Sequence, residues 1–154
     1  MTKRKVFSII GLVLTVFLIG NMFLPLLKSD YSSISTWEYF DKNDAMHVNI
    51  IILIELIVAA LFFILQICGA LKRATFTLFT IGFYVTYFDL VYFITFAKND
   101  YMQYTSFGFW LGFIVSIALL AVTVIGSAVG NEKSARPVAG PVSYDPQTGQ
   151  PINQ

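Results

Sequence analysis

Four long apolar runs, separated by shorter polar stretches, occupy most of the sequence up to about residue 130. They cover residues 6–27, 48–71, 76–96 and 107–129. A helix needs about 20 mostly apolar residues to cross a hydrocarbon core about 30 Å thick, and each run is long enough. Strands of a membrane barrel would instead alternate apolar and polar residues over segments of about ten residues. The pattern therefore predicts four membrane-spanning helices.

Short polar connections join these runs, and they set the expected fold. A loop of residues 28–47, a tight turn of residues 72–75 and a loop of residues 97–106 link consecutive spans. Short connections make neighbouring helices antiparallel. We therefore expect an all-α integral membrane protein, an antiparallel four-helix transmembrane bundle. Its membrane domain covers residues 6–130, between a basic amino-terminal segment (residues 1–5) and a polar tail (residues 131–154) that is predicted to be disordered.

The first connection contains the signal for one further helix. Ser35 is followed three residues later by Glu38, a capping-box pattern that predicts a short helix over residues 36–43. Such a helix would place Trp37 and Phe40 on one side. We expect it to lie at the membrane interface with these aromatic side chains at the level of the headgroups. The alternative is a lid or a docking surface for an extracellular partner.

Composition excludes several classes of protein. The chain is 56% hydrophobic and only 12% charged, with a mean hydropathy of +0.71, whereas soluble domains are about 25% charged. A soluble domain or a disordered chain is therefore excluded, and the net charge of +1 gives no basis for nucleic acid binding. A single cysteine, Cys68, excludes an internal disulfide and a cysteine-rich metal site, and we expect it to be a buried packing residue.

The distribution of basic residues predicts the orientation of the spans. Seven of them lie on one side of the predicted membrane, namely Lys3, Arg4, Lys5, Lys72, Arg73, Lys133 and Arg136. The other two loops contain only Lys28, Lys42 and Lys98. Because basic residues accumulate on the cytoplasmic side, both termini are expected in the cytoplasm. Short loops, a brief tail and the absence of glycosylation sequons favour a bacterial plasma membrane.

Two carboxylic acids, Glu55 and Asp89, lie inside predicted spans. Each is seven residues from the outer end of its span, which places both about 10 Å below the outer boundary at 1.5 Å per residue. Asn21 and Ser116 fall at nearly the same level, so the sequence predicts a polar layer with one residue from each helix. Gln66 would extend this layer towards the cytoplasm.

This layer has two interpretations. Acids inside a membrane are costly, by about 2.5–3.5 kcal/mol each, and they are a functional-site hypothesis by default. No lysine or arginine in the spans neutralises Glu55 or Asp89, so a pocket open to the outside would bind a cation or a small ligand. The structural alternative is a pair of protonated acids that hydrogen-bond to Asn21 and nearby tyrosines. We expect no bound cofactor and no metal centre built from cysteine and histidine.

Glycines repeat at intervals of four residues in the last span. Gly108 and Gly112 form one pair, and Gly126 and Gly130 form a second. Small residues at this spacing let two helices approach closely in lipid. We expect the stripe to pack inside the bundle. The alternative is that Gly108 and Gly112 mediate a homo-oligomer or bind another membrane protein.

Catalytic motifs are not recognisable, so we do not expect an enzyme. An intramembrane aspartic protease needs two aspartates, a serine hydrolase needs a base beside its serine, and thiol redox chemistry needs a second cysteine. The leading hypothesis is a small non-enzymatic membrane protein that acts through protein partners, as an accessory subunit, a regulator or an immunity-type protein. The alternative is a subunit of a small-solute or cation transporter or channel that uses Glu55 and Asp89.

Overall fold

The computed structural model describes residues 3–42, 46–72 and 74–131, so most of the predicted tail (residues 131–154) lies outside the described part. Its elements are α1 (Lys3–Asn21), β1 (Pro25–Lys28), β2 (Ser33–Ser35), α2 (Thr36–Lys42), α3 (Met46–Cys68), α4 (Thr75–Tyr84), the π-helix η1 (Val85–Leu90), α5 (Val91–Lys98), the 3₁₀ helix η2 (Tyr101–Tyr104) and α6 (Phe107–Asn131). Within the described residues, four helical segments are long and apolar enough to cross a membrane: Lys3–Asn21, Met46–Cys68, Thr75–Lys98 and Phe107–Val129. The predicted helical bundle is confirmed at this level.

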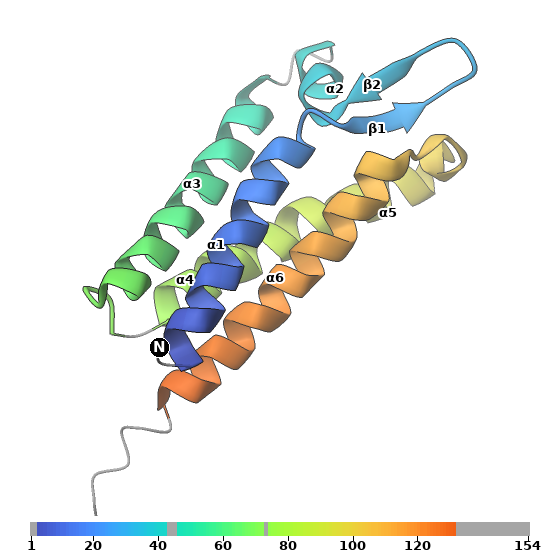
Figure 1. Cartoon of the computed structure of the whole chain (residues 1–154). Helices are drawn as coiled ribbons and strands as arrows, with labels where there is room; N and C mark the ends of the chain where they lie inside the picture. Colours follow the sequence, from blue (N-terminus) through green and yellow to red (C-terminus); the bar gives the residue numbers. More distant parts are fainter. Residues whose placement is uncertain (1–2, 43–45, 73, 132–154) are drawn as a thin grey trace, which may run out of the picture.

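The four long helical segments run side by side, with α1 between α3 and α6 and with α4 and α5 behind them (Figure 1). Helix α1 packs against both α3 and α6, and α4 also contacts both of them. The strands and α2 lie together at one end of the bundle, which we call the hairpin end. The amino terminus lies at the opposite end, which we call the amino-terminal end.

The first span differs from its predicted bounds. We expected one helix over residues 6–27, but α1 ends at Asn21 and the chain continues as strand β1. Pro25 explains the difference, because proline has no backbone N–H and disfavours helical geometry in the residue before it. Strand β1 pairs antiparallel with β2, with Pro25 opposite Ser35 and Lys28 opposite Ser33. The fold is therefore not purely α-helical.

The second span is shorter than predicted at its carboxyl end. Helix α3 ends at Cys68 instead of residue 71, because Gly69 adopts a left-handed backbone conformation with φ of 80°, which is typical of a residue that terminates a helix. Cys68 is exposed at this terminus, so the expectation that it is a buried packing residue is wrong.

The predicted capping box is present at the start of α2. The backbone N–H of Ser35 donates to Glu38 Oε2 over 2.9 Å, and the backbone N–H of Glu38 donates to Ser35 Oγ over 3.2 Å. Phe40 is only 8% exposed and lies in the main apolar core, with its ring edge-on to Tyr92. Helix α2 thus turns this aromatic side chain into the bundle instead of leaving it free at the level of the headgroups.

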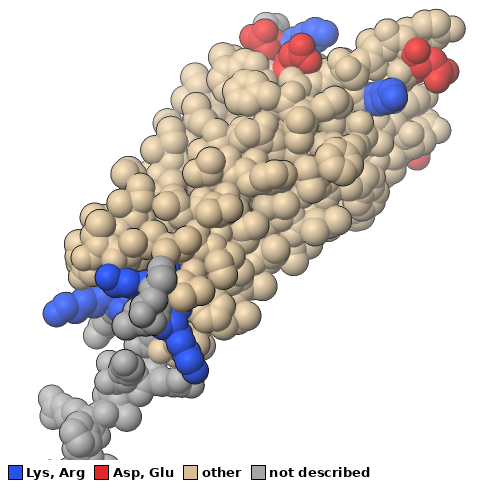
Figure 2. Space-filling view, viewed as in Figure 1, with Lys and Arg blue, Asp and Glu red and all other residues tan. Residues whose placement is uncertain are grey.

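Charged side chains lie at the two ends of the molecule, and a broad band without visible charge separates them (Figure 2). Lys3, Arg4 and Lys5 begin α1 at the amino-terminal end. The four acidic residues that the structure describes outside the spans lie at the hairpin end, and they are Asp30, Glu38, Asp41 and Asp100. Large apolar side chains are exposed along the band. Water would disfavour so large an apolar surface, but the acyl chains of a bilayer suit it.

The glycine stripe of α6 packs inside the bundle. A Cβ atom at Gly108 would collide with the backbone oxygen of Pro25, one at Gly112 would lie 2.5 Å from Asn21 Nδ2, and one at Gly126 would lie 3.1 Å from the Cβ of Phe7. These glycines therefore let α6 approach α1 and the segment that follows it. The surroundings of Gly130 lie outside the described part of the chain.

Candidate functional site

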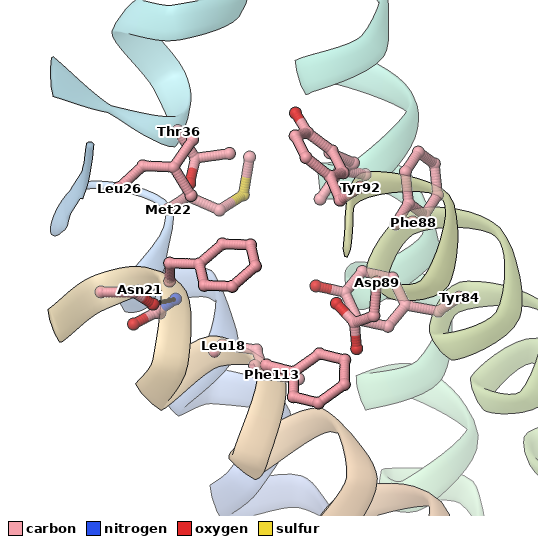
Figure 3. Close-up of a pocket in the computed structure, with 14 residues that line it drawn as sticks. Leu18, Asn21, Met22, Leu26, Thr36, Tyr84, Phe88, Asp89, Tyr92 and Phe113 are labelled. Carbon is pink, nitrogen blue, oxygen red and sulfur yellow. Dashed lines mark hydrogen bonds between the residues drawn. The ribbon is translucent and has the colours of Figure 1, made fainter. Parts of the chain in front are cut away.

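A cavity of about 70 Å³ lies inside the hairpin end of the bundle, where α1, α6 and the third span meet. Most of its wall is apolar, and its polar side chains are Asn21, Thr36, Tyr84, Asp89 and Tyr92. Asp89 and Tyr84 project from one wall, and Asn21 lies on the opposite wall (Figure 3). Tyr92 lies nearer than Asp89 to the end of the cavity that Thr36 and Leu26 line. None of the residues that line the cavity is Lys, Arg or His.

The π-helix η1 decides where Asp89 points. In an α-helix, residues five apart such as Tyr84 and Asp89 would point about 140° apart at 3.6 residues per turn. The wider turn of the π-helix over Val85–Leu90 rotates Asp89 towards the face that Tyr84 occupies, and both side chains reach the cavity. Single π-helical turns inside α-helices often occur at functional sites.

Ser116 of α6 is the direct partner of Asp89. Its hydroxyl is hydrogen-bonded to the carboxylate Oδ2 of Asp89 and also lies 2.9 Å from the backbone oxygen of Phe113. One hydroxyl has one proton, so it can donate to only one of these acceptors at a time. An ionised Asp89 accepts a hydrogen bond from this hydroxyl, whereas a protonated Asp89 would donate to Ser116 and leave the hydroxyl free to donate to Phe113. Of the predicted polar layer, the structure thus brings Asp89 and Ser116 into direct contact.

Two oxygen atoms at the cavity residues have no hydrogen-bond partner. The amide nitrogen of Asn21 donates to the backbone oxygen of Gly108 over 3.0 Å, which fixes the orientation of the amide. Its oxygen Oδ1 is buried and unpaired, and so is the hydroxyl of Tyr92. Buried polar groups nearly always have partners, so these two oxygens are exceptions that the protein atoms around them leave unsatisfied.

The segments between the spans close the cavity at the hairpin end. We call the part formed by β1, β2, α2 and η2 the cap. The backbone N–H of Trp37 donates to the oxygen of Met22 over 3.1 Å, the side chain of Asn49 donates to the oxygen of Trp37 over 2.8 Å, and the N–H of Ser106 donates to the oxygen of Leu26 over 2.9 Å. These bonds join the cap to α3, to the residue that follows α1 and to the residue that precedes α6. They hold Thr36 and Leu26 over the cavity.

Glu55 is not part of this site. The buried face of α3 includes Ile52, Leu56, Ala59, Phe63 and Gln66. Of the residues of α3, Ile52 lines the cavity. Glu55 is half-buried beside this face, and within the described part of the chain it makes no hydrogen bond. The predicted depth placed Glu55 near Asp89, but the rotation of α3 separates the two acids.

Gln66 belongs to a second polar cluster, near the amino-terminal end. Its side-chain oxygen accepts from Ser8 Oγ over 3.0 Å, and its amide nitrogen donates to the hydroxyl of Thr77. Arg4 donates to the backbone oxygen of Leu71 nearby over 2.6 Å. This cluster joins α1, α3 and α4, and it does not continue the polar cavity at the hairpin end.

Sequence reasoning missed two residues that shape the site. Thr36 reaches the cavity only because the cap folds back over the bundle, and no local pattern indicates that. Asn49 is fully buried and ties α3 to the cap. A polar residue inside the apolar run of residues 48–71 is a usable signal for Asn49, of the same kind that singled out Asn21.

Comparisons with models of protein families, with curated proteins and with solved structures give no significant match for this chain. Within the described residues, no three His, Cys, Asp or Glu side chains come together in a way that would hold a metal ion. Function must therefore be inferred from the cap, the cavity and the distribution of charge.

Proposed function

We propose that this chain is a small, non-enzymatic, multi-pass membrane protein that acts through a protein partner, as an accessory subunit, a regulator or an immunity-type protein. The cap is the observation that carries this proposal. It is an ordered structure, and the hydrogen bonds given above hold it to α3 and to the residues that flank α1 and α6, although the bundle itself needs only short connections.

The surface of the cap has the chemistry of a protein contact. Tyr31 at the tip of the hairpin is 99% exposed, and Tyr101 and Tyr104 of η2 are 42% and 45% exposed. A groove of about 220 Å³ lies between η2 and the hairpin and includes Leu27 and Ile34. Tyrosine is enriched at protein interfaces, where its ring is buried and its hydroxyl stays hydrogen-bonded. The partner that fits this surface is the extracytoplasmic part of another protein.

The proposed orientation places the cap outside a bacterial plasma membrane and both termini in the cytoplasm. In the described part of the chain, four basic residues lie at the amino-terminal end (Lys3, Arg4, Lys5 and Lys72) and three at the hairpin end (Lys28, Lys42 and Lys98). This difference supports the assignment, because basic residues accumulate on the cytoplasmic side. In this orientation the cap is the largest described structure outside the lipid.

Affinity purification from the native membrane tests the proposal. The parent protein should retain one other protein in a fixed stoichiometry after extraction in mild detergent. Replacing two exposed tyrosines, Tyr31→Ala and Tyr104→Ala, should reduce its recovery about tenfold or more, since central aromatic residues often contribute 2 kcal/mol or more to an interface.

Phe79→Ala is the matched control, because Phe79 is 75% exposed on α4, far from the cap. This variant should retain the partner as the parent does. Purification of the parent without any stoichiometric protein, or equal loss in the Phe79 variant, would contradict the proposal.

A subunit of a cation or small-solute transporter or channel is the second candidate. The sequence suggested this candidate because Glu55 and Asp89 were expected to form an acidic pair. Glu55 lies outside the cavity that Asp89 lines, so the pair does not support it. The cavity itself still favours this candidate, because an intramembrane acid beside unpaired oxygens is typical of ion pathways. A cation site at Asp89 is its minimal requirement.

A further inference from the structure

We infer that the cavity at the hairpin end is a binding site for one small monovalent metal cation, of the class of Na⁺. The cation would sit at the Asp89 carboxylate, beside the hydroxyl of Tyr84, with water molecules that connect it to Asn21 and Tyr92. This inference does not rest on the proposed function, because a regulator and a transport subunit could both contain such a site.

The charge of the cavity selects a monovalent ion. Asp89 is the one charged side chain among the lining residues. An uncompensated charge is costly in an apolar environment, so a single positive charge matches the carboxylate. A divalent ion would keep one positive charge unmatched, and no second acid of the described chain lines the cavity to neutralise it.

The atoms available to a ligand select a hard ion. The polar side chains of the wall offer a carboxylate, an amide oxygen and hydroxyl groups, and oxygen ligands of this kind suit hard metal cations. The amide nitrogen of Asn21 donates one of its two N–H groups to Gly108, and the amide oxygen is the group of Asn21 that could serve as a ligand to a cation. The one sulfur atom among the lining side chains is the thioether of Met22, a soft ligand that hard cations do not prefer.

The size of the cavity limits the ligand to an ion with a little water. A volume of about 70 Å³ holds a few water molecules at about 30 Å³ each and is far below the 300 Å³ or more of typical pockets for organic ligands. Asn21 and Asp89 lie on opposite walls (Figure 3). Because Asn21 Oδ1 and the Tyr92 hydroxyl are buried and unpaired, water beside the cation would bond to them after a small shift of the neighbouring side chains.

Ser116 fits a site that exchanges a proton for a cation. With the cation bound, Asp89 is ionised and accepts a hydrogen bond from the hydroxyl of Ser116. With the cation absent, a protonated Asp89 can donate to Ser116 while the hydroxyl turns to Phe113, 2.9 Å away. The other titratable groups that line the cavity are Tyr84 and Tyr92, and α1, α2, α3 and α6 contribute none. Protons should therefore compete with the cation.

Thermal unfolding of the full chain in nanodiscs tests the inference. LiCl, NaCl and KCl are compared with choline chloride at equal ionic strength, because the choline cation is too large for the cavity. At least one metal chloride should raise the unfolding midpoint of the parent with increasing concentration, as expected of a ligand that binds only the folded state. The rise should shrink at lower pH, and titration calorimetry should give one cation per chain.

Three variants make the test specific. Asp89→Asn should abolish the cation-dependent rise, and Tyr92→Phe should keep the fold but raise the apparent Kd several-fold. Glu55→Gln is the matched control, an acid-to-amide change in the neighbouring span outside the cavity, and it should respond as the parent does. An equal rise with choline, a midpoint that depends on pH but on none of the three metal ions, or an unchanged Kd in Tyr92→Phe would overturn the inference.

Discussion

At the scale of single residues, the glycines of α6 show how the absence of a side chain positions a helix. Gly108 lies directly against the backbone of Pro25, and Gly112 lies against the amide of Asn21. Both contacts border the cavity, so the close approach of α6 to α1 also places Asn21 opposite Asp89. A second chain cannot use the same glycine faces while α1 covers them, and an oligomer through this stripe stays a prediction without support from the packing.

Gly108→Ala should destabilise the protein by about 1–3 kcal/mol, the usual cost of overpacking, since the new methyl group meets a backbone carbonyl that has no side-chain freedom to move. Gly20→Ala is the control, because a Cβ atom there has no other atom within 4 Å. Alanine favours a helix by about 1 kcal/mol over glycine, so this variant should be neutral or more stable. The free energy of unfolding in mixed micelles measures both, and similar losses would contradict the packing argument.

At the scale of elements, two local conformations decide what the cap and the cavity present. The capping box starts α2 immediately after β2 and so directs Phe40 into the core. The wider turn of the π-helix η1 directs Asp89 into the cavity. The sequence reveals the capping box because Ser and Glu at this spacing have a known mechanism, but no residue pattern in Val85–Leu90 indicates a π-helix.

The stability of α2 should depend on pH through Glu38. Hydrogen bonds from the backbone and the side chain of Ser35, helped by the charge of Lys42, lower the pKa of the exposed Glu38 carboxyl below its ordinary value of 4.5. A lowered folded pKa means that this stabilisation is complete above the ordinary value and is lost as the pH falls through the lowered one. The hydrogen-exchange protection factors of α2 amides should therefore fall in that range.

Glu38→Gln provides the control for this prediction. Its amide oxygen can still accept from the N–H of Ser35 but does not titrate, so the protection of α2 in this variant should not change with pH over the same range. A parent whose α2 protection factors stay constant through this range would show that the capping box does not limit the opening of the helix.

At the scale of the whole molecule, the difference in charge between the two ends predicts the orientation in the membrane. Labelling of a thiol at each end tests this orientation. Cys68 is the only cysteine of the chain, and it is exposed at the end of α3, beside the basic amino-terminal end. If that end is cytoplasmic, a membrane-impermeant maleimide should not label the parent in intact cells. Labelling should appear once the cells are permeabilised.

A double variant, Cys68→Ser with Ser32→Cys, moves the thiol to the exposed loop of the hairpin. The same reagent should label this variant in intact cells. The reverse result, with Cys68 labelled from outside and the loop protected, would invert the proposed topology and place the cap in the cytoplasm.

The sequence by itself determined the features that depend on composition and local spacing. Four apolar runs fix the number of long helices because only a helix satisfies its own backbone hydrogen bonds within an apolar environment. The positions of Asp89 and Ser116 along their runs predicted that the two lie at nearly the same depth, and in the structure their side chains are in contact. The position of Ser35 and Glu38 was enough to predict the start of α2.

The tertiary structure alone decided the rotation of each helix and the path of the chain beyond it. Glu55 and Asp89 share a depth, but depth along an axis says nothing about the direction of a side chain around it, and the packing of α3 turns Glu55 away from the cavity that η1 turns Asp89 into. Thr36 joins the site across a fold of the cap. Contacts of this kind form between elements that are distant in the sequence. They depend on how all the helices pack together, and no single segment of the sequence specifies that packing.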